Sequence, residues 1–373
     1  RSGGKQSAPQ PPKKKDVLVE PAPTPVPTPR PTDFRFAINS APQSFDPARA
    51  QDVNESQILN HLFEGLVEYG SGADYLVPGV AEKWRISPNG KIYVFRLRDD
   101  ARWSDGRPVT AHDFRRSWLR ILEPAARLPN RQFLMGVQGA KAYSRGHAPA
   151  STVGIEAVNA RTFRVTLTQS MPYFLELCAT TALRPVPPPM PNRTRGHGPD
   201  GRLTNGPYRL AERTPEGVLR LERNQAYWNS RDIFIERVFI RAVSDNEEVV
   251  RLYLAGKLDW TGTVDLPLNN RPALAKRTDY HEDPYYGVYY LRTNLQHNWL
   301  KDSRVRQALS LSIDRGKLAK HVGGGMRPAP HFVPPTTDYN APDHLLGFYP
   351  KRARSILEQA SLRPLRSPLV VAV

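Results

Sequence analysis

Apolar and polar residues alternate in several short segments of the chain, which is the pattern of half-buried β-strands. The alternation is clear over residues 34–38, 91–97 and 162–167. In the second segment Tyr93, Phe95 and Leu97 share one side, and in the third Phe163, Val165 and Leu167 do. Each of these segments is therefore predicted to be a strand with one face in the core.

Other segments carry apolar residues at helical spacing. One face of a predicted helix holds Ile58, Leu59, Leu62, Phe63 and Leu66. A second helix is predicted over residues 110–122, where Thr110 and Asp113 have the spacing of a capping box. We interpret His112 and Asp113 as surface residues at this helix start. Two further helices are predicted over residues 246–258 and 302–313, the latter capped by Asp302.

Residues 281–294 form a tyrosine-rich segment with Gly287 in its middle. A glycine in a strand lets another backbone approach closely, and the flanking aromatic side chains offer apolar walls with polar tips. A strand that another backbone approaches closely and an ordinary buried strand explain these residues equally well.

The two ends of the chain have unusual compositions. Residues 1–33 are rich in proline and lysine, so we expect a disordered, extended tether rather than part of the core. Residues 369–373 are an apolar run typical of a buried strand. An exposed edge of this kind promotes aggregation, so we expect something to cover it.

Composition narrows the function classes. Hydrophobic residues make up 39% and charged residues 24% of the chain, as in globular proteins. The formal net charge is +17, but the arginines are spread singly along strands and helices without an aromatic-basic motif, so we expect no nucleic-acid partner. Cys178, the single cysteine, lies in an apolar run and is predicted to be buried and inert.

Catalytic and cofactor motifs are missing from the sequence. It contains no nucleophile elbow, zinc-protease motif, phosphate-binding loop or dinucleotide fingerprint, and its histidines are scattered. We therefore expect no catalytic residue, no cofactor and no metal. Hydrolysis of peptides is a weaker alternative that would need a nucleophile or metal.

Four motifs follow one another in register. They read FEGLVEY at residue 63, LVPGVAEKW at residue 76, SPNGKIYVFRLR at residue 87 and WSDGRPVTAHDFRRSW at residue 103. This succession resembles the extracytoplasmic solute-binding proteins of the dipeptide and oligopeptide class, family 5, which serve ABC importers. The later LKDSRVRQALSLSIDR at residue 300 is similar to a further motif of that family.

The resemblance implies a periplasmic-binding-protein-like α/β fold of class II, with two lobes and an extra subdomain in the first. Residues 34–284 would form the first lobe, and residues 285–373 a hinge strand and the start of an incomplete second lobe. It implies capture of oligopeptides in the cleft between the lobes, in the periplasm or at the cell-envelope surface. The implied ligand-binding residues are Gln51, Val53, Tyr285, Gly287 and Tyr290.

Family members continue well beyond the position that matches Val373, so we expect a C-terminally truncated version. The implied partners are peptides and the membrane subunits of an ABC importer, with residues 1–33 as a tether to an anchor. The rest of the polypeptide, a complementing second chain or a rearranged fold would cover residues 369–373. A structural or assembly role for the truncated fold is the alternative function.

Overall fold

The computed structural model describes residues 32–70, 75–188, 200–262, 264, 266–267, 269–282, 287–322, 325–329, 331–333 and 347–360. The chain divides into two compact units, Arg1–Val264 and Asp265–Val373. The predicted lobe boundary at residues 284 and 285 lies within the second unit. Tyr285, residues 369–373 and all but the end of the predicted tether lie outside the described residues.

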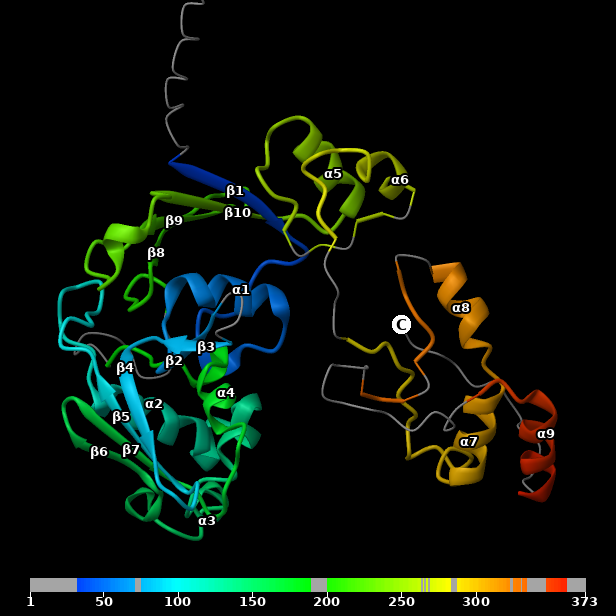
Figure 1. Ribbon diagram of the computed structural model, residues 1–373, viewed down its shortest axis with the longest axis horizontal. Helices are drawn as coiled ribbons and strands as arrows, with labels where there is room; N and C mark the ends of the chain where they lie inside the picture. Colours follow the sequence, from blue (N-terminus) through cyan, green and yellow to red (C-terminus); the bar gives the residue numbers. More distant parts are fainter. Residues whose placement is uncertain are drawn as a thin grey trace, which may run out of the picture. The chain divides into compact units, whose positions relative to one another are not determined.

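A four-stranded sheet, here called the β1 sheet, has the strand order β1-β10-β9-β8 (Figure 1). Its strands are β1 (Asp33–Ile38), β8 (Tyr208–Arg213), β9 (Leu219–Arg223) and β10 (Arg237–Ala242). β1 pairs with β10 in parallel, with Phe36 opposite Ile240, and the other pairs are antiparallel. The alternating strand predicted over residues 34–38 is confirmed.

A second four-stranded sheet, the β5 sheet, is antiparallel with the order β4-β5-β7-β6. Its strands are β4 (Ala81–Ile86), β5 (Ile92–Leu97), β6 (Ile155–Asn159) and β7 (Thr162–Thr166), so both predicted strands of this sheet are confirmed. β2 (Val67–Tyr69) pairs with β3 (Leu76–Pro78) in antiparallel orientation. The short helices α3 (Ala140–Ser144) and α4 (Phe174–Cys178) complete this region.

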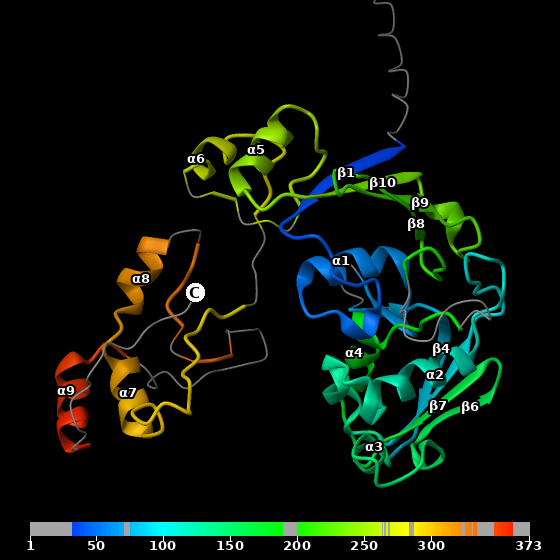
Figure 2. The ribbon, with the colours of Figure 1, turned by 180° about the vertical axis from the view of Figure 1, so that it is seen from behind.

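Two longer helices cover the sheets of the first unit. α1 (Val53–Leu62) lies beside the β1 sheet in both views, and α2 (Ala111–Leu122) lies against the β5 sheet (Figures 1 and 2). Trp118 of α2 is buried edge-on against Phe163, with 5.1 Å between ring centroids. Cys178 is also buried, as predicted, and its burial raises the pKa of the thiol.

The start of α2 confirms the predicted capping box. The backbone N–H of Thr110 donates to Asp113 Oδ2 at 2.9 Å, and both halves of the box are formed. The expectation that Asp113 lies at the surface is wrong, because only 6% of the residue is exposed. Its carboxylate also accepts a hydrogen bond from Arg116, which is 2.9 Å away, so this cap is built into the core.

The helix predicted over residues 246–258 is shorter than expected. α5 spans Asn246–Leu254 and stops before Gly256, which has a φ of 66°. A glycine in this left-handed conformation satisfies the last carbonyl groups of a helix, and Lys257 N–H donates back to Leu252 O at 2.9 Å. The local geometry of Gly256 therefore sets the end of the helix.

The described part of the second unit is helical. It contains α6 (Arg271–Leu274), α7 (Ser303–Leu311), α8 (Arg315–Val322) and α9 (Pro350–Gln359). Asp302 caps α7 by accepting from Arg304 N–H at 2.8 Å, which confirms the predicted cap. Ala308 and Leu311 of α7 pack against Ala353 of α9.

The tyrosine-rich segment differs from the strand predicted for it. Its described residues 287–294 have no regular secondary structure, and Tyr289 is 85% exposed. A strand needs a neighbouring strand to pair its N–H and C=O groups, and the described residues of the second unit contain helices and irregular segments but no strand. The tyrosine and glycine content that suggested a strand gave no information about a partner for it.

Candidate functional site

The carboxyl ends of β1 and β10 meet at one edge of the β1 sheet, because these two strands are parallel. α1 begins shortly after β1, and α5 begins shortly after β10. Asp52 caps α1 by accepting from Glu55 N–H at 2.8 Å, and Asp245 caps α5 by accepting from Glu247 N–H at 2.9 Å. Carboxyl ends of parallel strands followed by helix N-termini are a common place for ligands in α/β proteins. We call this edge the carboxyl edge.

Gln51 and Val53 lie at the carboxyl edge, at the start of α1. Both side chains are exposed, Val53 by 57%. The carboxylate of Glu55 accepts hydrogen bonds from the backbone N–H groups of Gln43, at 3.2 Å, and Gln51, at 3.1 Å. A buried acceptor thus fixes the backbone that carries the two exposed side chains.

The same loop is also held by residues from other parts of the chain. Asp46, only 1% exposed, receives two hydrogen bonds of 2.6 Å from the guanidinium of Arg120 on α2. Asn130 donates to the backbone oxygens of Ala48, at 3.3 Å, and Ala50, at 2.8 Å. These contacts make the loop a rigid support, and rigidity reduces the entropy lost when a ligand binds.

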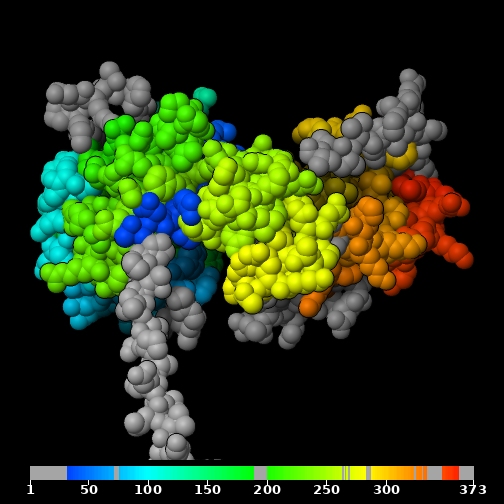
Figure 3. Space-filling view, turned by 90° about the horizontal axis from the view of Figure 1, so that it is seen from above, coloured from blue at the N-terminus to red at the C-terminus, as the bar shows by residue number. Residues whose placement is uncertain are grey.

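The segment after α5 lies beside β1, the outermost strand of the β1 sheet, and extends that sheet. Asp259 N–H donates to Arg35 O at 2.8 Å, and Phe36 forms a parallel bridge with Trp260. The Trp260 ring is 5.5 Å from that of Phe36 and remains 40% exposed. Residues near 250–260 and β1 form a continuous surface in the space-filling view (Figure 3). Because this segment runs parallel to β1, it leads toward the carboxyl edge.

Gly262 is required by the close approach of this segment to β1. Its φ is 80°, and a Cβ atom there would lie 1.9 Å from Ala37 O. We expect Gly262→Ala to lower the free energy of unfolding by about 1–3 kcal/mol, because the backbone would have to leave β1 and the residue would be strained. Urea unfolding would measure this, with Gly217→Ala as the control. Gly217 has a similar φ of 80° but open space around it, so an equal loss in both variants would contradict the close-approach argument.

A buried carboxyl group lies between segments that follow the β1 sheet strand β9 and the β5 sheet strand β5. Glu64 accepts hydrogen bonds from Tyr227 Oη, at 2.6 Å, and Trp228 Nε1, at 2.9 Å. Its backbone is bonded to the side chain of Asn205, which donates to Glu64 O at 2.9 Å. The guanidinium of Arg98, just after β5, lies 3.7 Å from the Trp228 ring centroid. We call Glu64, Asn205, Tyr227 and Trp228 the Glu64 junction.

Burial raises the pKa of Glu64 to about 7, although the hydrogen bond from Tyr227 lowers it. The nearby Glu68 carboxylate raises it further, while Arg184 lowers it. Arg184 is itself bonded to Glu68 and to Phe63 O. The junction thus holds a carboxyl group that changes charge near neutral pH, inside the protein and away from the exposed Gln51 and Val53.

The structure brings Gln51 and Val53 together at the carboxyl edge. Gly287 and Tyr290 belong to the second unit, where both are exposed, and the Tyr290 ring lies 4.9 Å from that of Phe332. A hollow of about 480 Å³ in the same unit is lined by residues 292–296. Sequence reasoning missed Asn39, Asn246 and Trp260, although an asparagine directly after an alternating strand was a usable signal for the first.

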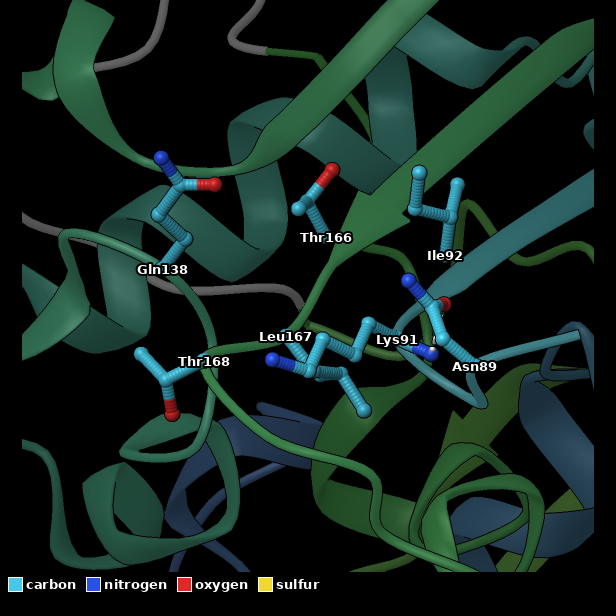
Figure 4. A pocket seen from close by; sticks show the side chains of 7 residues that line it. All are labelled: Asn89, Lys91, Ile92, Gln138, Thr166, Leu167 and Thr168. Atoms are coloured by element: carbon cyan, nitrogen blue, oxygen red, sulfur yellow. Dashed lines mark hydrogen bonds between the residues drawn. The ribbon is translucent and has the colours of Figure 1, made fainter. Parts of the chain in front are cut away.

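Another hollow, of about 420 Å³, lies at the end of the β5 sheet (Figure 4). It is lined by Asn89, Lys91, Ile92, Gln138, Thr166, Leu167 and Thr168. The hydroxyl groups of Thr166 and Thr168 point in different directions, and Thr168 Oγ1 donates to Gly136 O at 3.1 Å. Because its polar groups do not converge, this hollow is a poorer candidate site than the carboxyl edge.

Two other kinds of feature are not found in the described part of the chain. No group of three or more His, Cys, Asp or Glu side chains there could hold a metal ion. Among the same residues, no helix has the length and apolar character needed to cross a membrane.

Comparisons with known proteins give consistent matches. The family described as "Bacterial extracellular solute-binding proteins, family 5 Middle" matches residues 75–366. The periplasmic murein peptide-binding protein MppA of Escherichia coli is 36% identical over 306 residues, covering 80% of this chain and 56% of the relative. The periplasmic oligopeptide-binding protein OppA of Salmonella typhimurium is 35% identical with the same coverage.

Solved structures show the same fold. The murein tripeptide binding protein MppA of Escherichia coli superposes with a TM-score of 0.82 at 32% identity, covering 90% of this chain and 67% of that one. Haemophilus influenzae OppA, in complex with RPPGFSPFR, gives a TM-score of 0.80 at 30% identity, covering 89% and 67%. The predicted α/β fold class is confirmed, and the chain spans little more than half the length of the curated relatives named above.

Proposed function

Because the chain belongs to the bacterial extracellular solute-binding proteins of family 5, we propose that it binds oligopeptides outside the cytoplasm for an ABC importer. The relatives are named as periplasmic peptide-binding proteins rather than enzymes. The observation that carries the proposal in this chain is the carboxyl edge, where a braced loop presents Gln51 and Val53 to solvent.

We further propose that an extended peptide pairs with backbone groups of the protein, as an added strand does. Gln51 and Val53 would contact it from the first unit, and Tyr285, Gly287 and Tyr290 from the second. Gly287 has no side chain to obstruct a neighbouring backbone. Tyr290 is 59% exposed and offers an aromatic face with a hydroxyl tip.

The same role implies partner proteins and a location in the cell envelope. The protein would deliver its ligand to the membrane subunits of an importer. Residues 1–33 would hold it at the envelope surface, and a further protein segment would complete the second unit. Exposed apolar side chains in that unit, including Leu291 at 65% and Phe332 at 66%, favour such a covering segment.

Isothermal titration with pools of di- to pentapeptides tests the proposal. We expect wild type to bind at least one pool, and Val53→Glu to weaken that binding about tenfold or more, because a bound peptide would desolvate the new charge. The variant should keep its stability, since an acidic residue in the first turn of α1 is favourable.

Val158→Glu is the matched control, because Val158 is similarly exposed, at 52%, but lies on β6. It should bind as wild type does. Absence of binding heat for every pool with a folded sample would overturn the proposed function.

A further inference from the structure

Two side-chain amides meet at the carboxyl edge. Asn39 directly follows β1, and Asn246 is the first residue of α5. Asn39 Nδ2 donates to Asn246 Oδ1 at 2.9 Å, although the residues are 207 positions apart. Both are half-buried. Next to them Asn54 of α1 donates to Ser40 Oγ at 3.4 Å, so a polar row joins the starts of the two helices.

The Asn39–Asn246 pair retains hydrogen-bonding capacity. A carboxamide has two N–H donors and an oxygen with two lone pairs, so one shared bond leaves an acceptor on Asn39 and a donor on Asn246. Neither side chain makes another hydrogen bond within the part of the chain that the structure describes. If the O and N assignments of both amides were exchanged, the free oxygen would belong to Asn246 and the free NH2 group to Asn39, so the pair would still offer both an acceptor and a donor.

The electrostatics of the edge favour a neutral ligand group over an anion. The helix N-termini on either side are already capped by the carboxylates of Asp52 and Asp245. The nearby cation Arg251 is paired with Asp245, at 3.2 Å, and with Glu248, at 2.8 Å. A phosphate or carboxylate would meet these acidic caps, whereas a peptide group is neutral and offers one C=O acceptor and one N–H donor.

We propose that Asn39 and Asn246 together hold one peptide group of the ligand main chain. This inference rests on the proposed peptide-binding function and adds two contacts to it. Asn246 donates to the ligand carbonyl, and Asn39 accepts from the ligand N–H. Because both groups belong to the main chain, the contact is independent of the ligand's side chains.

The test uses the full chain and a peptide that titration has shown to bind wild type. Asn246→Asp keeps an oxygen that accepts from Asn39, and aspartate suits a helix start. It loses the N–H group that donates to the ligand carbonyl. We expect about tenfold weaker binding of every peptide that binds wild type, since removing a partner leaves a polar group of the ligand unpaired. Asn39→Ala should weaken binding about threefold or more.

A series of ligands, each N-methylated at one peptide bond, locates the contact. Methylation of the bond held by the pair should weaken binding to wild type but not weaken it further in Asn39→Ala. Gln138→Ala, an exposed amide far from the edge, is the control and should bind as wild type does. Unchanged affinity in both asparagine variants, with wild type binding, would overturn this inference and leave the proposed function intact. If wild type binds no peptide, the proposed function fails and this inference with it.

Discussion

Replacing Arg120 with Met is expected to lower the free energy of unfolding of the first unit by about 3 kcal/mol or more. Asp46 is 1% exposed and receives both of its 2.6 Å side-chain hydrogen bonds from Arg120. Without the guanidinium, a buried carboxylate would keep only the N–H of Ala48, at 3.1 Å, and Arg49, 3.9 Å away. Burying a charge without a partner is among the largest penalties that a single substitution causes.

Urea unfolding of wild type, Arg120→Met and the double variant Asp46→Asn with Arg120→Met would measure this. The double variant should recover part of the loss, because the uncompensated charge is gone. Arg115→Met on the same helix is the control, since that guanidinium forms no ion pair with a residue that the structure describes. If Arg120→Met cost no more than the control, the buried pair would not hold the loop as argued.

The second large effect is the pH dependence that Glu64 contributes. Its pKa is raised by burial from 4.5 to about 7, so the folded protein binds a proton at pH values where the unfolded chain has released it. The resulting stabilisation is complete below pH 4.5 and is lost as pH rises through about 7. The shift corresponds to about 3 kcal/mol. Glu68, Arg184, Tyr227 and Arg98 are the titratable groups near the junction.

The difference in stability between wild type and Glu64→Gln isolates this contribution, since the other carboxylates are common to both proteins. We expect wild type to lose up to about 3 kcal/mol relative to Glu64→Gln between pH 5 and pH 8. Denaturant unfolding at several pH values measures it. A difference that stays constant across this range would show that Glu64 does not titrate near neutrality.

Local features of the fold were predictable from the sequence because their causes are local. The capping box of Thr110 and Asp113 depends on residues three positions apart, and the two strands β5 and β7 follow from alternation. The predicted helix ran too far, to residue 258. Its apolar pattern indicated a helix, but the left-handed conformation of Gly256 decides where that helix ends. The prediction of a strand near Gly287 was wrong, because a strand forms only where a neighbouring strand pairs with its backbone N–H and C=O groups.

The candidate site depends on residues far apart in the sequence. Gln51 and Val53 were proposed from the resemblance, whereas the contacts that support them had no local signal. Asp46 and Arg120 are 74 positions apart, and Asn39 and Asn246 are 207 apart. Only the parallel pairing of β1 with β10 brings the second pair together. A sequence pattern that extends over one helix or strand does not show which distant residues will meet.

The pairing of β1 with β10 also affects the order of folding. Asp33 and Arg237, which form an ion pair across these strands, are separated by 204 positions, so the chain between them must close a very long loop. The β5 sheet connects strands that are closer in sequence and can assemble earlier, because loop closure costs less entropy. β1 is synthesised long before β10, so it is among the last of the described strands to find its neighbour. Until then it remains open to chaperones and to contact with other unfolded chains.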